Sequence, residues 1–470
     1  MALDEVAPGQ PSPATLISTE PHSTAEVRSV PSRNATSSTS SSSTAGSSTS
    51  TLEYGHEPWD EFRERVKNLC GNLWPPQTTI TYRFSNSHAA QRLRSIKLLG
   101  SLVPAPQAPV IERLHGGGNN RITGITLPSF HAADKFILRV PRDDQARPDR
   151  EVAILDYVRE HTTFPIPTIA GKDFSCNNPL AKPYVLQYRI PGCDLNKIWS
   201  EISHSQRCDV AREVGCVIRT LLSLESPVPG LVEPGSNDVV NAKTPHIVPF
   251  ELKGPDGEIV QEPEAYMARD FGTTLNLFQT QFKRWRAWAL DRSHGHILRN
   301  VELYDAMLEI ANEMNALGLF TDENCLCHID LHPRNIMVKA NSDVPLLITA
   351  FLDWDDAVFA PKAVNCEPPW WLWDDEGDEH LDEDECDPWP YELKGANELP
   401  STTEKQELKR ILEEHAGPEY NRMAYNEPSR LLRCLFRLAT VGLTASHHYK
   451  AAEKVLADWD VLRDSLMHSG

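Results

Sequence analysis

Cys327-His328-Ile329-Asp330-Leu331-His332-Pro333-Arg334-Asn335 and, after an apolar run, Phe351-Leu352-Asp353-Trp354-Asp355 are the two most informative segments of this chain. Asp330 and Asn335 lie in one short loop, a spacing that lets a carboxylate face an acceptor hydroxyl while an amide oxygen turns toward a metal ion. Asp353 would supply a second metal contact. The two segments therefore hold three side chains suited to phosphoryl transfer.

The sequence between these segments predicts a hairpin. Residues 336–339 and 346–352 are apolar and flank the turn-rich residues 340–343. Such a hairpin returns Asp353 to the loop, where Asn335 and Asp353, completed by a nucleotide and water, are sufficient ligands for Mg²⁺. The alternative is that these residues are ordinary turn and strand-end residues. The hairpin combined with Asp-Trp-Asp favours the functional interpretation.

These motifs resemble the aminoglycoside phosphotransferase family, kinase-like enzymes related to choline kinases. Its members carry His-Gly-Asp-Leu-His-Pro-Gly-Asn and then Ile-Asp-Trp-Asp or Ile-Asp-Trp-Glu. The resemblance implies that Asp330 is the catalytic base, that Asn335 and Asp353 hold the metal, and that His328 braces the loop from behind.

Two positions of the loop depart from the family pattern. Ile329 and Arg334 stand where the family usually has glycine. Arg334 either reaches a phosphate or points to solvent, and solvent is the commoner place for an arginine. The departures bear on the identity of the substrate more than on the chemistry.

A glycine-rich turn upstream is a candidate phosphate loop. Residues 110–114 and 122–127 read as strands, and the turn between them holds Gly116, Gly117, Gly118 and Asn119. Such a loop lets backbone amides approach phosphate oxygens closely. A plain hairpin tip would look the same, and the Gly-Lys-Ser/Thr ending of a phosphate loop is absent.

Arg139 and Glu151 are expected to form an ion pair. Residues 136–141 read as a strand with one inward cation, and residues 149–158 have helical spacing. The pair is similar to the kinase lysine and glutamate that hold the α- and β-phosphates, with arginine in place of lysine. A structural salt bridge is the alternative, and the position between the glycine turn and the catalytic loop favours the nucleotide.

Residues 184–192 form another expected strand and turn, and they resemble the connector between kinase lobes whose backbone binds adenine. Gln187, Tyr188 and Arg189 are the candidates for that contact, although a core strand fits the pattern almost as well. The later sequence reads as mostly helical, with apolar stripes over residues 275–285 and 303–317 and a closing helix over residues 431–448. We therefore expect an α+β, protein-kinase-like fold with a small antiparallel-sheet lobe and a mostly helical lobe.

Composition limits the partners. The formal net charge of −20 over 470 residues argues against nucleic acid and anionic membranes. A small hydroxyl-bearing acceptor, cationic or neutral, is compatible with it. The acidic excess is concentrated in residues 374–385, which we interpret as a solvated insertion within residues 374–400. The alternative is that this run draws a cationic acceptor toward the site.

The chain divides into three parts by composition. Residues 1–55 are rich in Ser and Thr and are expected to be disordered. Residues 56–190 hold a helical lead-in, with a helix expected over residues 80–102, and the nucleotide-binding lobe. Residues 191–470 hold the helical catalytic lobe. Without a signal-like N-terminus or a long apolar run, we expect a cytoplasmic protein that crosses no membrane.

The ten cysteines show no paired spacing and predict no disulfide framework. Cys325, Cys327, His328 and His332 cluster in sequence, but we expect the two thiols on opposite faces of a strand and hence no zinc site.

The sequence thus predicts a kinase that uses ATP and Mg²⁺ to phosphorylate a small molecule. The main alternative is a nucleotide-binding scaffold with weakened catalysis, because of Arg139 and the altered loop. A protein kinase is less favoured, because the Ala-Pro-Glu end of an activation segment is absent after Asp353.

Overall fold

The structure is a computed structural model that describes residues 57–74, 108–114, 119–128, 134–235, 246–254, 259–260, 272–291, 297–339, 346–374 and 399–468. The described residues belong to one compact unit that runs from Thr51 to Gly470. Four expectations lie outside them: the disordered tail, the helix over residues 80–102, the three glycines of the turn, and most of the acidic insertion.

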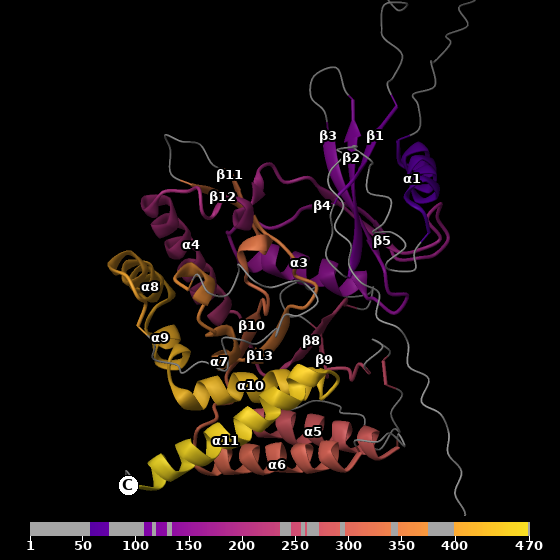
Figure 1. The fold of residues 1–470 in the computed structure, drawn as a ribbon. Coiled ribbons are helices and arrows are strands. Elements are labelled where there is room, and N and C mark those ends of the chain that lie inside the picture. The colour runs from indigo at the N-terminus through magenta and orange to yellow at the C-terminus, as the bar shows by residue number, and fades with distance from the viewer. Residues whose placement is uncertain are drawn as a thin grey trace, which may run out of the picture. The chain divides into compact units, whose positions relative to one another are not determined.

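A five-stranded antiparallel sheet forms the small lobe (Figure 1). Its strand order is β1-β2-β3-β5-β4, with bounds β1 Val110–Arg113, β2 Asn120–Leu127, β3 Asp134–Pro141, β4 Ile169–Asp173 and β5 Tyr184–Tyr188. Along β3, Phe136, Leu138 and Val140 alternate into the core, which places Arg139 on the opposite face. The expected strands around the glycine turn and before the connector are confirmed.

One helix packs on this sheet, and a second helix joins the core of the other lobe. Helix α1 (Trp59–Leu73) packs Phe62, Val66 and Leu69 against the sheet core. Helix α3 (Pro148–His161) begins with a proline at its first turn and buries Val152, Leu155 and Val158 at helical spacing. The helix expected after Arg139 is therefore confirmed.

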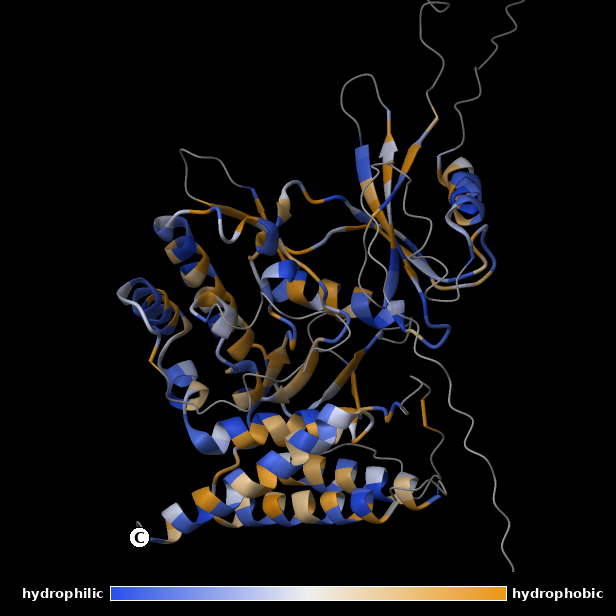
Figure 2. Cartoon of the chain, viewed as in Figure 1, coloured by the Kyte–Doolittle hydropathy of each residue, from blue (hydrophilic) through white to orange (hydrophobic). Residues whose placement is uncertain are grey.

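The second lobe is mostly helical, as expected, and it also contains two small sheets. One has the order β7-β10-β13-β8-β9 and the other β12-β11-β6. The strands are β6 Cys193–Asp194, β7 Glu225–Ser226, β8 Gly230–Glu233, β9 His246–Val248, β10 Asn324–Cys327, β11 Ile336–Lys339, β12 Leu347–Phe351 and β13 Val358–Pro361. Figure 2 shows β10 and β13 in the hydrophobic colours, in keeping with their complete burial.

Most helices of this lobe lie to the left of and below its sheets in the view of Figure 1. They are α4 His204–Leu222, α5 Thr274–Asp291, α6 Ile297–Ala316, α7 Lys362–Asn365, α8 Thr403–Ala416, α9 Pro418–Ala424, α10 Glu427–Val441 and α11 Ser446–His468, with short 3₁₀ turns η2 Leu195–Ile198, η4 Pro333–Asn335 and η5 Trp370–Leu372. Helices α5 and α6 pack together and bury the expected stripe that includes Phe278, Phe282 and Trp285.

The single closing helix expected over residues 431–448 is wrong. Helix α10 ends at Val441, and α11 begins at Ser446. Gly442 lies between them with a φ of +74°, in the left-handed region that favours glycine. A Cβ atom there would lie 2.6 Å from the ring of Trp285. The break is therefore set by a contact with a distant helix, which periodicity does not reveal.

The expected hairpin is confirmed. Strands β11 and β12 pair antiparallel, with Ile336 opposite Phe351. The amide of Leu352 donates to the carbonyl of Asn335 at 2.7 Å, which holds the two ends of the hairpin together. The residues just before β11 and just after β12 are thereby brought side by side.

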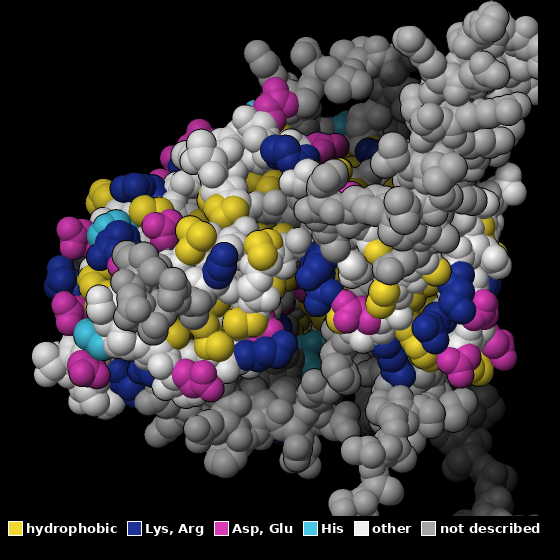
Figure 3. Space-filling model, turned by 90° about the horizontal axis from the view of Figure 1, so that it is seen from above, with side chains coloured by type: hydrophobic (Ala, Val, Ile, Leu, Met, Phe, Trp, Pro, Cys, Tyr) yellow, Lys and Arg dark blue, Asp and Glu magenta, His cyan; other side chains and the backbone are white. Residues whose placement is uncertain are grey.

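The described residues contain no helix with the length and apolar character needed to cross a bilayer. Seen from above, the described surface carries Lys and Arg side chains interspersed with Asp and Glu (Figure 3).

Candidate functional site

The loop after β10 holds the candidate catalytic aspartate in an unusual backbone. Ile329, which replaces the family's glycine, has a φ of +68°. A positive φ is a genuine outlier for a β-branched residue and costs about 1–3 kcal/mol. The chain therefore keeps the left-handed turn at this position without the residue that forms it most easily.

Asp330 and Asn335 are in direct contact. The side-chain amide of Asn335 donates to Oδ2 of Asp330 at 2.7 Å and to its carbonyl at 3.0 Å. The amide oxygen of Asn335 is then the atom left for a cation. Asn335 is buried, so its amide is held in place.

The side chain of Arg334 is exposed, as expected if it points to solvent, and it also binds Asp330 within the loop. Its guanidinium donates to Oδ1 of Asp330 at 2.6 Å. Burial disfavours the charge of Asp330, but Arg334 and His332 outweigh it and hold the pKa of this carboxyl below its usual range. Asp330 is therefore ionised at neutral pH.

His328 links the two motifs. It is buried, its Nε2 donates to the carbonyl of Leu352 at 2.8 Å, and its ring packs edge-on against Trp354 at 4.5 Å. Burial lowers the pKa of His328, although the Leu352 carbonyl and Asp330 oppose that shift. A neutral imidazole therefore ties the loop of Asp330 to the residue before Asp353, in keeping with the expected brace.

Asp353 stands at the end of β12 with a φ of +62°. Burial, and then the charge of Asp355, raise the pKa of its carboxyl, and Asp330 adds to this effect. The hydrogen bonds of Leu352 with Asn335 and with His328 hold Asp353, the next residue, beside the loop of Asp330. The structure thus brings together the three groups that the sequence separates.

Arg139 and Glu151 form the expected ion pair, with 3.3 Å between Nε and Oε1. Arg139 also reaches Asp355 at 2.8 Å and Asp353 at 3.5 Å. Glu151 is buried, and burial beside Asp355 and Asp353 raises its pKa despite Arg139. Three carboxyl groups thus surround one guanidinium, and the raised pKa of Glu151 leaves Asp353 and Asp355 as the charged groups beside Arg139.

Asp355 and Asn120 belong to this cluster and were not singled out in the sequence. The amide of Asn120, at the start of β2, donates to Asp355 at 2.8 Å and so ties the base of the glycine turn to the Asp-Trp-Asp segment. The second aspartate of that segment was the available signal for Asp355. Asn120 offered none, because its partner lies 235 residues away.

The remaining candidates for nucleotide binding lie in different surroundings. Gly116, Gly117 and Gly118 lie outside the described residues, and Asn119 is exposed beside them. Gln187 is buried and donates to Glu151 at 3.0 Å. The amides of Tyr188 and Arg189 donate to the carbonyls of Thr168 and Lys135. An adenine ring would therefore have to use other backbone groups of this connector.

The model of the phosphotransferase enzyme family (APH) matches residues 111–389, which span most of the small sheet, the loop of Asp330 and the segment beyond Asp353. The chain belongs to this family. The resemblance drawn from the two motifs is thereby confirmed, and with it the protein-kinase-like fold class.

Individual relatives are distant. The curated protein "altered inheritance of mitochondria protein 9, mitochondrial" of Candida glabrata is 26% identical over 156 residues, which cover 30% of this chain and 24% of that protein. The ethanolamine kinase of Plasmodium vivax is 12% identical, with a TM-score of 0.42 and coverage of 86% and 95% of the two chains. The aminoglycoside phosphotransferase APH(4)-Ia is 16% identical, with a TM-score of 0.40 and coverage of 78% and 97%.

The residues of the family site fit a hard divalent cation. Asn335 and Asp353 offer an amide oxygen and a carboxylate, the donors that Mg²⁺ accepts alongside phosphate oxygens and water. Asp353 and Asp355 lie beside the single cation Arg139, and a divalent cation would offset their remaining negative charge.

Trp371 makes a further contact with the loop of Asp330. Its indole nitrogen donates to the carbonyl of Leu331 at 3.0 Å, next to Asp330. Trp370 and Trp371 also line a pocket with Ile329, Leu331 and His332, on the side of the catalytic loop that faces η5. The tryptophan-rich segment therefore both packs and borders the site.

The expectation that the thiols of Cys325 and Cys327 lie on opposite faces of a strand is wrong. Alternate residues of a strand face the same side, and the two sulfur atoms lie 3.9 Å apart. Both thiols are buried, and His328 turns to Leu352 instead of to them. Among the described residues, these four side chains do not meet around one point.

Proposed function

We propose that this chain is an ATP- and Mg²⁺-dependent kinase that transfers the γ-phosphoryl group to a hydroxyl of a small molecule. The observation that supports it best is the convergence of Asp330, Asn335 and Asp353 through the hydrogen bonds at Leu352. Family membership supports the phosphotransferase class. The acceptor hydroxyl and the nucleotide are parts of the proposal.

Asp330 is proposed to receive the acceptor hydroxyl. Its two oxygens already accept from Asn335 and Arg334, but a carboxylate has about four lone-pair sites and can accept a further hydrogen bond. Its lowered pKa makes it a weak base, which suits a loose transition state in which orientation matters more than early proton removal. Mg²⁺ at Asn335 and Asp353 would neutralise charge on the transferred group.

On the nucleotide side, Arg139 is the proposed phosphate contact. Its guanidinium is held by Glu151 and Asp355 and points to the same region as Asp353. An arginine can bind phosphate oxygens in a bidentate manner, so lysine is not required for that role. Gln187 fixes Glu151 from the strand side and so keeps the pair oriented.

The pocket beside Leu331 is the proposed acceptor site. It is lined by Trp370 and Trp371, whose ring faces suit an apolar or a cationic acceptor. Glu367, on the same pocket, is already paired with Arg437. We therefore propose a hydroxyl-bearing small molecule, including amino alcohols, without assigning antibiotics as substrates.

A nucleotide-binding scaffold without transfer is the second candidate. The observation in its favour is the 3.5 Å contact of Arg139 with Asp353, which places a protein cation on a proposed metal ligand. Release of ADP with any member of a panel of amino alcohols, sugars and hydroxylated amines would exclude it. A protein kinase would be recognised by phosphorylation of generic protein substrates.

The replacement Asp330→Asn tests the proposed base. It should lower turnover by about 10²–10⁴-fold, because the group that orients and accepts the proton is lost. Nucleotide binding, followed by fluorescence titration, should change little, because Asp330 is not a phosphate contact. Turnover at the wild-type rate in a folded variant would exclude the role.

The cytoplasm is the proposed location. None of the nine cysteines that the structure describes is in a disulfide, which supports a reducing compartment. The name of the Candida glabrata relative contains the word mitochondrial, so imaging of the tagged full-length chain against a mitochondrial marker is the appropriate test.

A further inference from the structure

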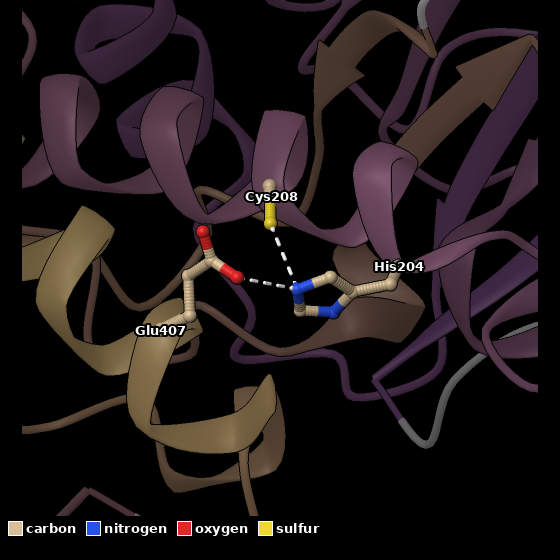
Figure 4. Close-up of side chains that lie close together, drawn as sticks. All are labelled: His204, Cys208 and Glu407. Carbon is tan, nitrogen blue, oxygen red and sulfur yellow. Dashed lines mark hydrogen bonds and ion pairs between the residues drawn. The ribbon is translucent and has the colours of Figure 1, made fainter. Parts of the chain in front are cut away.

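A second group of metal-ligating side chains lies on helices α4 and α8, outside the cluster around Asp330. Ser203 caps α4 through a capping box, so the helix begins at His204. Cys208 follows one turn later on the same face. Helix α8, which packs along α4, brings Glu407 to the same point. Figure 4 shows the thiol of Cys208 and the carboxylate of Glu407 directed at one ring nitrogen of His204.

The distances suit a tetrahedral ion. Nε2 of His204 lies 2.9 Å from Oε2 of Glu407 and 3.5 Å from Sγ of Cys208, and the three ligand atoms all lie within 4.8 Å of one another. Ligands at ordinary zinc bond lengths stand about 3.4–3.6 Å apart. The nitrogen and sulfur are already at that spacing, and Glu407, whose side chain is 48% exposed, can rotate to adjust its two distances.

The donor set selects the kind of metal. One thiolate, one imidazole and one carboxylate are typical zinc ligands, whereas Mg²⁺ prefers oxygen atoms alone. Burial, and then the charge of Glu407, raise the pKa of Cys208, so this thiol is protonated before a metal binds. Binding would therefore release a proton from Cys208.

The charges around Cys208 do not block a cation. Arg212 and Arg410 lie near it, but each already has an acidic partner, Asp209 and Glu414 respectively. The side chain of His204 is 30% exposed, which leaves a path for an ion from solvent. An ion pair between His204 and Glu407 alone accounts for two of the three groups and gives no role to the thiol.

We propose that His204, Cys208 and Glu407 bind one Zn²⁺ ion, with water as the fourth ligand, and that this ion cross-links α4 to α8. Helix α4 packs on β10, the strand that leads into the catalytic loop. Helix α8 contacts η5, from which Trp371 donates to Leu331 of that loop. The ion therefore links the two helices that pack against β10 and η5, the elements on either side of the loop.

Cobalt provides the test, because a Co²⁺–thiolate bond gives a charge-transfer absorption that a purely oxygen- and nitrogen-bound ion lacks. Chelator-treated full-length protein is titrated with Co²⁺ and then with Zn²⁺, in an excess of Mg²⁺. The wild type should develop the band with one equivalent and lose it to Zn²⁺. Cys208→Ser should abolish the band, and Glu407→Gln should weaken affinity by at least about 100-fold, since even indirect ligand contacts contribute 10- to 100-fold.

Cys216→Ser is the matched control, because Cys216 is a partly exposed thiol of the same helix. The Cys216→Ser variant should keep the cobalt absorption band, and Zn²⁺ should still raise its unfolding temperature by a few degrees. The Cys208→Ser variant should show neither effect. A band that persists in Cys208→Ser, or a wild type without a band in excess Co²⁺, overturns the proposal. If Cys208→Ser does not fold, the affinity of Glu407→Gln for Co²⁺ provides the test, because the side chain of Glu407 is largely exposed.

Discussion

Ile329 and Asp353 adopt left-handed backbone conformations at the two ends of the candidate site. Each stands beside a hydrogen-bonded anchor: Ile329 follows His328, and Asp353 follows Leu352, whose carbonyl accepts from that histidine. Strained residues of this kind persist only where the surroundings hold them. At the level of single residues, the site therefore depends on the hydrogen bond between His328 and Leu352 as much as on its aspartates.

Asp355→Asn should raise the Mg²⁺ concentration needed for half-maximal activity by about 10-fold, the scale of an indirect ligand contact. Asp355 holds the guanidinium of Arg139 at 2.8 Å, while Asp353 lies 3.5 Å from it. Without Asp355, Arg139 competes with the metal for Asp353. The measurement is turnover against Mg²⁺ concentration.

Asp356→Asn is the control for that experiment, because it removes the same charge from the exposed neighbouring residue. Equal Mg²⁺ dependence in the two variants would show that net charge, and not the contact with Arg139, is responsible.

His328→Phe should cost about 1–3 kcal/mol of unfolding free energy, because the ring packing on Trp354 is kept while the Leu352 carbonyl loses its donor. The pH dependence should change as well. The pKa of buried His328 is lowered from 6.5, so below that pH the unfolded chain binds a proton that the folded chain does not. Wild-type stability therefore falls as the pH drops below 6.5.

Denaturant unfolding between pH 7.5 and 5.5 is the measurement, and the profile of His328→Phe should be flatter than that of the wild type. Parallel profiles would show that His328 does not carry this proton linkage.

At the scale of elements, the break between α10 and α11 is set by the neighbouring helix. Gly442 ends α10 with its amide bonded to Leu438, and Trp285 of α5 fills the space where a Cβ would stand. The indole nitrogen of Trp285 also donates to the carbonyl of Ala439. One aromatic side chain thus both caps the end of α10 and excludes every residue but glycine after it.

Gly442→Ala should lower the unfolding free energy by at least about 2 kcal/mol, because positive φ and overpacking against Trp285 both contribute. Gly318→Ala is the matched control. Gly318 has a φ of +69° with open space around it, so its cost should be about 1 kcal/mol, from the backbone alone. Equal losses in denaturant unfolding would show that the contact with Trp285 contributes nothing.

At the scale of the whole unit, helix α3 is fastened to the sheet of the second lobe. Arg150 donates to Glu233 of β8 and to Glu251, and Arg147 also reaches Glu233. Because α3 carries Glu151, this network fixes the partner of Arg139 relative to the catalytic loop. The orientation of α3 therefore depends on ion pairs between the lobes.

Arg150→Gln should lower the unfolding free energy by about 1–2 kcal/mol, because the replaced side chain is only 12% exposed, Glu251 loses its cation and Glu233 keeps only Arg147. It should also raise the KM for nucleotide by loosening Glu151. Arg410→Gln, in an exposed pair on α8, should change stability by less than about 0.5 kcal/mol. Unchanged nucleotide KM in Arg150→Gln would separate α3 from nucleotide binding.

The sequence by itself determined the parts that depend on local pattern. The hairpin between Asn335 and Asp353, the strand of Arg139 and the helix of Glu151 follow from periodicity and turn residues, which act over a few positions. The motif order identified the family for the same reason, since both motifs are contiguous in the chain.

Other features became visible only in the three-dimensional structure: which charged groups pair, where α10 ends, and which side chains meet as possible metal ligands. The pairing of Arg139 and Asn120 with Asp355, the break at Gly442 and the meeting of His204 with Glu407 each join residues more than 150 positions apart. Such contacts arise from the packing of whole elements, because burial and close approach depend on neighbours that no local pattern specifies.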